Sequence, residues 1–480
     1  MSQSLDNFRT WISLLTLLFV VLTTGLYVNF PWLIAANAGI SICLATLWLV
    51  PSDVMGDRLG RNGVILALLA ITLAALQMLP LPASVWQVLP GRDFEIRALG
   101  AVGHQNSALP FTLSPYGTSV ALLTMISGFG FFCVGLAFPK KKRHYLAAAI
   151  VLAALVNIFF GLFVKSAAPA SETFLGQFYD AGNVSGLFFN RNFMAALLYA
   201  SIPMLAAFLL YFVAKSRISA FATLVFGFIY LLLILLGLGA TGSRTGIILS
   251  MLALLASPIL VRGAVPKKAK SSRAVIVTVV IAFVVLGLAG QASVSRIARL
   301  DPVNEQRLTI YSLTLRAITH YFPAGSGLGS FVPVYQQIEQ PADMVGSAYV
   351  NHAHNDWLEL ALEGGAPMII LMLAGLAWLA AAQYRVWTTV GDLSENLAPK
   401  AASLVVILLL LHSLVDFPLR TFADAAVFAL SLGLMAARPA LPKLRRAHRS
   451  EQFERAPQPH VHAGPLWPQP RPTASEQELH

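Results

Sequence analysis

Charge is scarce in this chain. Only 11% of its 480 residues are Asp, Glu, Lys or Arg, while 57% are hydrophobic, far from the averages of soluble globular domains. The few charges are not evenly spread, because long apolar stretches alternate with short polar breaks. Apolar stretches of about 20 residues have the length that crosses a bilayer as a helix. The composition therefore excludes a soluble globular protein and favours a membrane protein.

Two further shortages narrow the class. The chain has two cysteines, Cys43 and Cys133. Both lie inside apolar stretches, so neither a disulfide framework nor a cysteine zinc site is expected. No Asp-X-Asp triplet occurs in the sequence, which argues against a sugar transferase that carries a divalent cation on that motif. That absence weakens the case for a metal, and we expect no cofactor.

The apolar stretches predict an all-α polytopic membrane protein with about twelve transmembrane helices. The predicted spans are 11–28, 32–50, 62–79, 117–138, 145–165, 193–213, 219–240, 247–262, 274–291, 366–384, 401–415 and 423–437. The first stretch is long and a second span follows it at once, so it is interpreted as a retained helix and not as a signal peptide.

These spans divide the chain into four parts. Residues 1–291 form a membrane domain of nine spans, and residues 292–365 form a large loop. Three further spans occupy 366–437, and the proline-rich, charged segment 438–480 is expected to be a disordered tail. A loop as long as 292–365 between membrane helices is usually functional.

Basic clusters indicate the orientation. Lysine and arginine gather at 140–143, 215–217, 267–273 and 443–449, and such an excess is typical of cytoplasmic loops. Twelve spans with both termini inside satisfy all four clusters and place the loop 292–365 outside. The net charge of +11 therefore reflects membrane topology and gives no sign of nucleic-acid binding.

The stretch NHAHNDWLELALEGG, residues 351–365, concentrates titratable side chains just ahead of an apolar run. Asp356 and Glu359 fit the N-cap and N3 positions of a helix that begins near Asn355. His354 then lies at the positive end of the helix dipole, which favours a neutral imidazole able to accept a proton. This predicts a general base.

Two other interpretations of the stretch remain open. His352 and His354 are also consistent with loop histidines exposed to solvent. A His-X-His sequence followed by Asp356 and Glu359 also supplies plausible metal ligands. Spacing alone does not choose among these readings.

Three arginines lie where an outside loop meets an apolar span: Arg191, Arg244 and Arg307. Arginine so near a membrane is costly unless its guanidinium snorkels, pairs or binds an anion. Snorkelling is the common explanation for any single arginine, but three on one face favour an anion. The guanidinium fork suits the two phosphates of a pyrophosphate.

Two shorter features complete the outside loops. Spaced glycines over 324–331 predict a tight loop and not a nucleotide cradle, since no strand precedes them and no Lys-Ser/Thr follows. Asp416 and Arg420 share a short turn and are expected to pair with one another.

Four motifs carry a family resemblance: GLFFNRNFMAALL, TGSRTG, RLTIYSLTLRAITHYFPAGSGLGSF and HAHNDWLELALEGGAP. In this order within about twelve spans, the chain resembles the O-antigen ligase and polymerase superfamily of bacterial inner-membrane glycosyltransferases. The similarity covers roughly residues 185–380. Its most specific element is His354 and Asn355, followed after nine residues by Gly365.

The resemblance implies a membrane glycosyltransferase fold of GT-C-like type and a metal-independent, inverting transfer on the periplasmic side of the inner membrane. The implied donor is an undecaprenyl-pyrophosphate glycan. The family's catalytic histidine falls on His354, and its pyrophosphate-binding arginines fall on Arg191, Arg244 and Arg307. A second histidine of part of the family matches His352. Candidates for a second catalytic role or for positioning are His352, Asn355 and Asp356.

The acceptor stays open in the sequence. The lipid A core, a growing polysaccharide and a protein hydroxyl are all known to the superfamily, and polysaccharide ligation or polymerisation is favoured over protein O-glycosylation. A transporter or flippase for lipid-linked glycans is the rival class. Such a protein should carry polar residues at mid-membrane depth and a repeat between its halves, whereas here the polar residues gather at one face.

Overall fold

The structure is a computed structural model of the chain. It describes residues 3–24, 32–50, 52–169, 173–178, 183–215, 217–261, 302–341, 343–344 and 349–440. Contacts divide the chain into two units, Met1–Leu441 and Pro442–His480. All features described below belong to the first unit.

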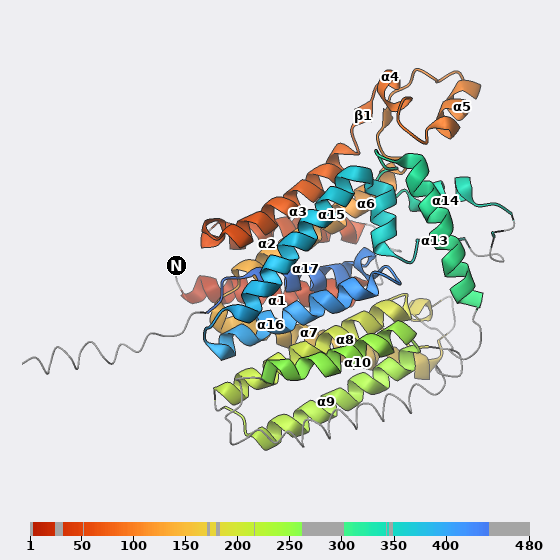
Figure 1. The fold of residues 1–480 in the computed structure, drawn as a ribbon. Helices are drawn as coiled ribbons and strands as arrows, with labels where there is room; N and C mark the ends of the chain where they lie inside the picture. Colours follow the sequence, from red (N-terminus) through yellow and green to blue (C-terminus); the bar gives the residue numbers. More distant parts are fainter. Residues whose placement is uncertain are drawn as a thin grey trace, which may run out of the picture. The chain divides into compact units, whose positions relative to one another are not determined.

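Long apolar helices make up most of this unit (Figure 1). In chain order they are α1 (Gln3–Thr23), α2 (Trp32–Leu49), α3 (Arg58–Leu76), α6 (Pro115–Ala137), α7 (Arg143–Ala167), α8 (Arg191–Ala214), α9 (Ala220–Thr241), α10 (Arg244–Ala256), α15 (Asp356–Thr388), α16 (Leu393–His412) and α17 (Phe422–Ala436). Over the described ranges, nine helices are long and apolar enough to cross a membrane, and α10 and α17 are shorter apolar helices. The predicted all-α, multi-pass membrane architecture is thereby confirmed.

Eleven of the twelve predicted spans coincide with one of these helices. The remaining span, 274–291, lies outside the described residues, as does most of the predicted tail. The total of twelve spans and the GT-C-like fold therefore stay predictions.

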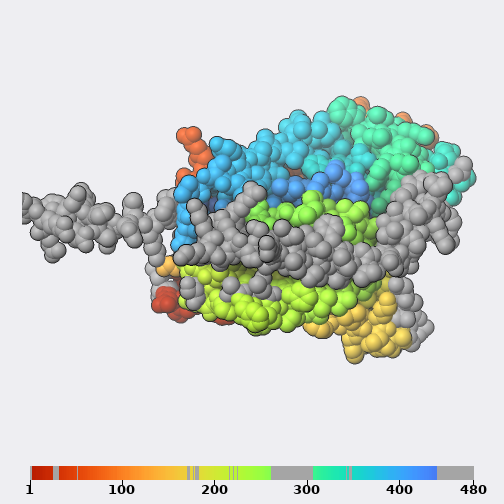
Figure 2. Space-filling view, turned by 60° about the horizontal axis from the view of Figure 1, so that its bottom comes forward, coloured from red at the N-terminus to blue at the C-terminus, as the bar shows by residue number. Residues whose placement is uncertain are grey.

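Two of the loops contain structure of their own. Between α3 and α6, β1 (Pro80–Leu81) pairs with antiparallel β2 (Leu109–Pro110), and α4 (Ala83–Trp86) and α5 (Asp93–Ala101) lie between these strands. The loop before α15 contains α13 (Pro302–Tyr321) and α14 (Phe331–Ile338). Figure 2 shows the surfaces of α13 to α15, in green to light blue, on one face of the unit.

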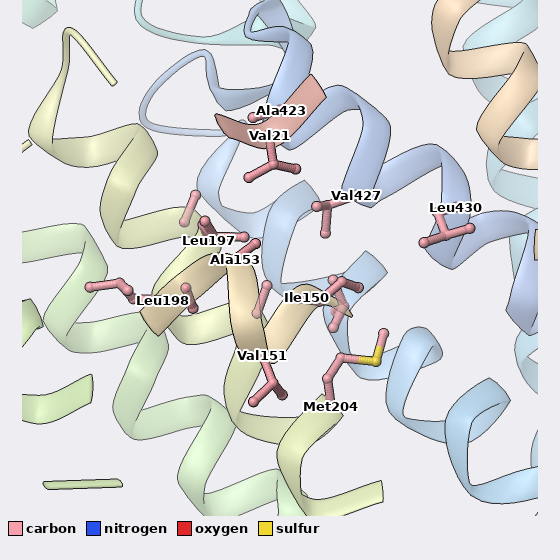
Figure 3. Packing of buried hydrophobic residues seen from close by; sticks show 14 of the residues in the cluster. Val21, Ile150, Val151, Ala153, Leu197, Leu198, Met204, Ala423, Val427 and Leu430 are labelled. Carbon is pink, nitrogen blue, oxygen red and sulfur yellow. The ribbon is translucent and has the colours of Figure 1, made fainter. Parts of the chain in front are cut away.

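The core joins helices that are distant in the sequence. Figure 3 shows Val21 of α1, Ile150 of α7, Leu197 of α8 and Val427 of α17 packed together. Each of these side chains is at most 1% exposed. Large hydrophobic side chains on the outer faces stay uncovered, for example Leu373 of α15 at 62%, as expected for helices that face lipid.

The loops lie at two opposite ends of the helix bundle. At one end, basic residues contact other turns: Lys142 donates to Asn7, Lys215 pairs with Asp392, and Arg385 pairs with Asp57. The other end gathers the stretches predicted to be outside, and a group of ion pairs connects them. The candidate site lies at this second end.

Candidate active site

His354 pairs with a buried carboxylate that is 62 residues further along the chain. The imidazole Nδ1 lies 3.2 Å from Oδ1 of Asp416, and the Asp416 side chain is 1% exposed while that of His354 is 28% exposed. A carboxylate at this distance accepts the Nδ1–H, which leaves the lone pair on Nε2. The arrangement therefore holds one tautomer and presents a proton-accepting nitrogen.

The backbone at His354 is held in an uncommon conformation. Its φ is 50°, in the left-handed region that few non-glycine residues occupy. The hydroxyl of Tyr311, on α13, donates to the His354 carbonyl over 2.9 Å, and the ring of Phe417 lies edge-on 5.0 Å from the imidazole. Conformations of this kind persist where surrounding contacts fix them, and they cluster at functional sites.

Asp416 is the point where three parts of the chain meet. Asn192, at the start of α8, donates to its Oδ2 over 2.6 Å, and the guanidinium of Arg307 lies 3.9 Å from the same oxygen. Burial acts to raise the pKa of the Asp416 carboxyl, but the hydrogen bond and charge of His354, followed by the charges of His412 and Arg307, lower it below its ordinary value. Asp416 is therefore ionised at neutral pH.

A second histidine–carboxylate pair lies beside the first. Nδ1 of His352 is 2.8 Å from Oε1 of Glu359, whose other oxygen accepts the backbone N–H of Ala353 over 2.9 Å. The His352 ring packs on Phe417 with centroids 4.1 Å apart. Phe417 thus contacts both imidazoles and fixes their spacing.

Arg420 binds three carboxylates of the first turns of α15. Its guanidinium lies 2.9 Å from Glu363, 3.4 Å from Glu359 and 3.6 Å from Asp356. Burial acts to lower the pKa of Arg420, but the three surrounding carboxylates raise it above its usual value. This cluster ties the start of α15 to the turn that carries Asp416.

Local hydrogen bonds show why α15 begins where it does. Asn355 is the N-cap, since its side chain accepts from the backbone N–H groups of Trp357 and Leu358. The expected start near Asn355 is confirmed, but the assignment of Asp356 as N-cap is wrong. Asp356 instead accepts from the hydroxyl of Ser413 over 2.8 Å, because a stronger local cap already satisfies the first turn.

Gly365 interrupts α15 nine residues after Asp356, the first residue of the helix. Its φ and ψ are 58° and −151°, and an added Cβ would lie 2.3 Å from the Pro323 carbonyl oxygen. Gly327 of the adjoining loop donates its N–H to the Glu363 carbonyl over 2.8 Å. The glycine-rich stretch 324–331 forms the predicted tight loop. The spacing of the His-Asn…Gly motif is the number of residues between the N-cap Asn355 and Gly365, where this loop packs against α15.

The three arginines lie at the same end of the bundle. Arg191 and Arg244 are the first residues of α8 and α10, and a Cβ added at Gly242, which ends α9, would be 3.9 Å from a guanidinium nitrogen of Arg191. Arg307, on α13, contacts the His354–Asp416 pair, with its guanidinium 3.9 Å from Asp416. Helix N-termini carry positive potential, so α8 and α10 add to the charge of their arginines.

One sequence prediction about this end is wrong. Asp416 and Arg420 do not pair with one another in the part of the chain that the structure describes, because each has other partners: His354 for Asp416 and Glu363 for Arg420. The sequence reasoning therefore missed Asp416 as a site residue. The available signal was a carboxylate immediately after a predicted span, a place where a charge needs a partner.

The four residues considered for a metal site have separate partners. His352 and Glu359 bind each other, His354 binds Asp416, and Asp356 binds Ser413. Over the described ranges, no group of three or more His, Cys, Asp or Glu side chains is placed to hold a metal ion.

An apolar cleft begins next to the site. Its volume is about 430 Å³ and its walls come from α3, α6, α15 and α17. Trp357 and Asp356 lie at its border with the site, and Leu371, Met372 and Phe428 are among the apolar residues that line it further along. The cleft is suited to a hydrocarbon chain.

Comparison with known families identifies one part of the chain. A family model described as O-antigen ligase matches residues 229–373. The matched stretch contains Arg244, Arg307, His352 and His354, so the resemblance to the O-antigen ligase and polymerase superfamily is confirmed there. No curated protein matches the chain. Asp416 lies outside the matched stretch.

Proposed function

We propose that this protein is a glycosyltransferase of the O-antigen ligase or polymerase type, which moves a glycan from undecaprenyl pyrophosphate to an acceptor hydroxyl. The observation that supports it best is the His354–Asp416 pair, at 3.2 Å, inside a helical membrane protein whose residues 229–373 match the O-antigen ligase model. A sugar transferase needs a base for the acceptor and a means to stabilise the departing phosphate.

In the proposed reaction His354 is the general base. As the acceptor oxygen attacks the anomeric carbon, Nε2 takes the hydroxyl proton and Asp416 stabilises the imidazolium that forms. A new C–O bond replaces the bond from the anomeric carbon to the pyrophosphate oxygen, and undecaprenyl pyrophosphate leaves with that electron pair. Attack opposite the leaving group inverts the anomeric configuration.

The pyrophosphate is assigned to the three arginines. Arg307 lies 3.9 Å from Asp416, which places its guanidinium near the proposed base, and Arg191 and Arg244 begin helices whose positive ends attract anions. Guanidinium groups stabilise the growing negative charge of a phosphate leaving group. No metal ion takes part in this scheme.

The neighbouring candidates are assigned positioning roles. Asn355 caps α15, Asp356 connects it to Ser413, and His352 packs on Phe417. All three fix the peptide that carries His354 without a direct contact to the reacting atoms. The apolar cleft between α3 and α15 is assigned to the polyprenyl chain of the donor.

Orientation follows from the positive-inside rule. The end with the basic turns is assigned to the cytoplasm and the end with His354 to the periplasm of a bacterial inner membrane. The matching family model is described as O-antigen ligase, and with the resemblance to the ligase and polymerase superfamily the acceptor is proposed to be a lipid A core sugar or a growing polysaccharide. Protein O-glycosylation and flipping of lipid-linked glycans are the alternatives to test against.

The test is glycan transfer in liposomes. Wild type, His354→Ala and the matched control His320→Ala, an exposed histidine at the end of α13, are reconstituted with an undecaprenyl-pyrophosphate glycan, a chelator and a panel of acceptors. The proposal expects transfer by the wild type and the control, and donor binding without transfer by His354→Ala. Equal activity of all three would exclude His354 as the base, and donor translocation without transfer would favour the flippase.

A further inference from the structure

A polar pocket of about 250 Å³ lies at the end of the bundle opposite to His354. Three parts of the chain enclose it: the turn between α2 and α3, the turn between α6 and α7, and Arg438, which follows α17. The polar side chains that line it are Ser52, Asp53, Asp57, Lys140, Arg143 and Arg438. This is the end where the basic turns gather.

Arg143 is a buried cation in this pocket. Its side chain is 2% exposed, and one guanidinium nitrogen donates to the Arg438 carbonyl over 2.9 Å. Nε and Nη1 have no hydrogen-bond partner, and within the described ranges no carboxylate lies within 4.0 Å of the guanidinium. An uncompensated buried charge is costly, so an anion in the pocket would remove a large penalty.

The other charges of the pocket do not supply that anion. Lys140 donates to the Pro439 carbonyl over 2.9 Å. A carbonyl is neutral, so this hydrogen bond does not offset the positive charge of Lys140. Asp57 is held by Arg385, with oxygen–nitrogen distances of 2.9 and 2.7 Å, and it also accepts from Gly60. Three cations thus face Asp53 and the Asp57 carboxylate that Arg385 already holds, while Glu395 of α16 acts on Arg143 and Lys140 without lying within 4.0 Å of either in the described part of the chain.

We propose that this pocket binds a phosphate group and that the groups that hold it are Arg143, Lys140 and Arg438. Two nearby guanidiniums and an ammonium match the charge and the several oxygens of phosphate. Basic pockets between membrane helices on the cytoplasmic side bind anionic lipid headgroups, and a free phosphate offers the same chemistry. The bound phosphate connects the turn between α6 and α7, the start of α7 and the end of α17, and its binding does not depend on the reaction proposed for His354.

The first arm of the test measures lipid binding. The full-length protein is purified into nanodiscs of phosphatidylcholine with phosphatidylglycerol, and retained phosphatidylglycerol is counted by native mass spectrometry for wild type, Arg143→Gln and Arg438→Gln. Arg438 is exposed, so its variant is expected to fold even if that of Arg143 does not. The control is Arg217→Gln, an exposed basic residue of the same end that is outside the pocket.

The expected result is that the wild type and Arg217→Gln retain the anionic lipid, and that Arg438→Gln lowers its affinity about five-fold, the effect of one basic group near a charged headgroup. The second arm titrates inorganic phosphate into protein in nanodiscs of phosphatidylcholine alone. Binding in this arm that is weakened by Arg438→Gln but not by Arg217→Gln supports the site with a soluble ligand. Absence of binding in both arms, or equal loss in Arg438→Gln and Arg217→Gln, overturns the proposal.

Discussion

Two histidine–carboxylate pairs pack on Phe417, and they differ in the sequence separation between the histidine and its carboxylate. His352 binds Glu359, seven residues away on the helix that it precedes, at 2.8 Å. His354 binds Asp416, 62 residues away, at 3.2 Å. Glu359 also lies 3.4 Å from Arg420, a cation that it shares with Asp356 and Glu363. Asp416 accepts from Asn192 over 2.6 Å, and the guanidinium of Arg307 lies 3.9 Å from it.

The difference bears on which pair takes part in the proposed reaction. Arg420 lies closer to Glu359 than Arg307 lies to Asp416, so Asp416 depends more on an imidazolium for its counter-charge. The His352–Glu359 pair joins residues close in sequence and stabilises the start of α15. The His354–Asp416 pair joins distant segments and therefore forms only in the folded protein. On this basis we propose that His352 is structural and His354 catalytic, and the five predictions below test the site.

The largest expected effect separates the two histidines. His354→Ala should lower the transfer rate by about 10,000-fold, near the upper limit of what a general base contributes, because no other described side chain at the site occupies its place. His352→Gln should lower it by less than about ten-fold, the loss of one hydrogen bond that positions a neighbour. Initial rates in liposomes measure both. Similar losses in the two variants would remove the distinction.

The second prediction concerns Asp416. Asp416→Asn should lower kcat by about 100- to 1,000-fold while donor affinity stays within a few-fold, since the amide neither fixes the Nδ1–H tautomer nor stabilises imidazolium. Single-turnover rates and donor binding measure the two quantities. A variant that loses donor binding and keeps kcat would place Asp416 in recognition and not in catalysis.

The same residue gives a stability prediction with a definite sign. Because the folded pKa of Asp416 is lowered, its contribution to stability is complete above its ordinary value of 3.8 and is lost as pH falls through the folded value. The melting temperature of the wild type should therefore exceed that of Asp416→Asn above this pH, and the gap should close below it. A gap that widens in acid would contradict the ionised state.

The fourth prediction concerns Arg420, which binds the carboxylate of the other pair. Arg420→Gln leaves Asp356, Glu359 and Glu363 buried without their cation, and loss of one partner of a buried ion pair costs about 3–5 kcal/mol of unfolding free energy. Thermal unfolding in detergent should detect this as a large decrease in the midpoint. The exposed Arg97→Gln, on α5, is the control, and an equally small effect of both changes would show that the cluster is dispensable.

The smallest expected effect concerns the donor. Arg307→Gln should raise the donor KM about 10- to 30-fold, the value of one charge-assisted hydrogen bond, with a smaller change in kcat. Arg316→Gln provides a matched control, because Arg316 is on the same helix but exposed. An unchanged KM in Arg307→Gln would leave Asp416 as the sole partner of this arginine and exclude it from pyrophosphate binding.

The sequence predicted the helices better than the site. Hydropathy has a strong signal over 20 residues, and the helix from Arg191 to Ala214 contains the predicted span 193–213 almost residue for residue. His354 was found through its position before a helix and through the family pattern. Its partner was not found, because the pairing of Asp416 with His354 depends on packing between α8, α15 and α16 and has no counterpart in local spacing. Arg420 was misassigned for the same reason, since the nearest acid in sequence is not the nearest in space.

The position of Asp416 also limits how such proteins can be recombined. The stretch that matches the O-antigen ligase model ends at residue 373, whereas Asn192 precedes it and Asp416 follows it. A chimaera made by exchanging only residues 229–373 between two relatives would join the histidine of one parent to the carboxylate of the other. If the proposed reaction holds, its activity would depend on how well the histidine of one parent fits the carboxylate of the other. Exchanges meant to alter the acceptor should therefore carry α8 and the turn after α16 along with the recognisable motif.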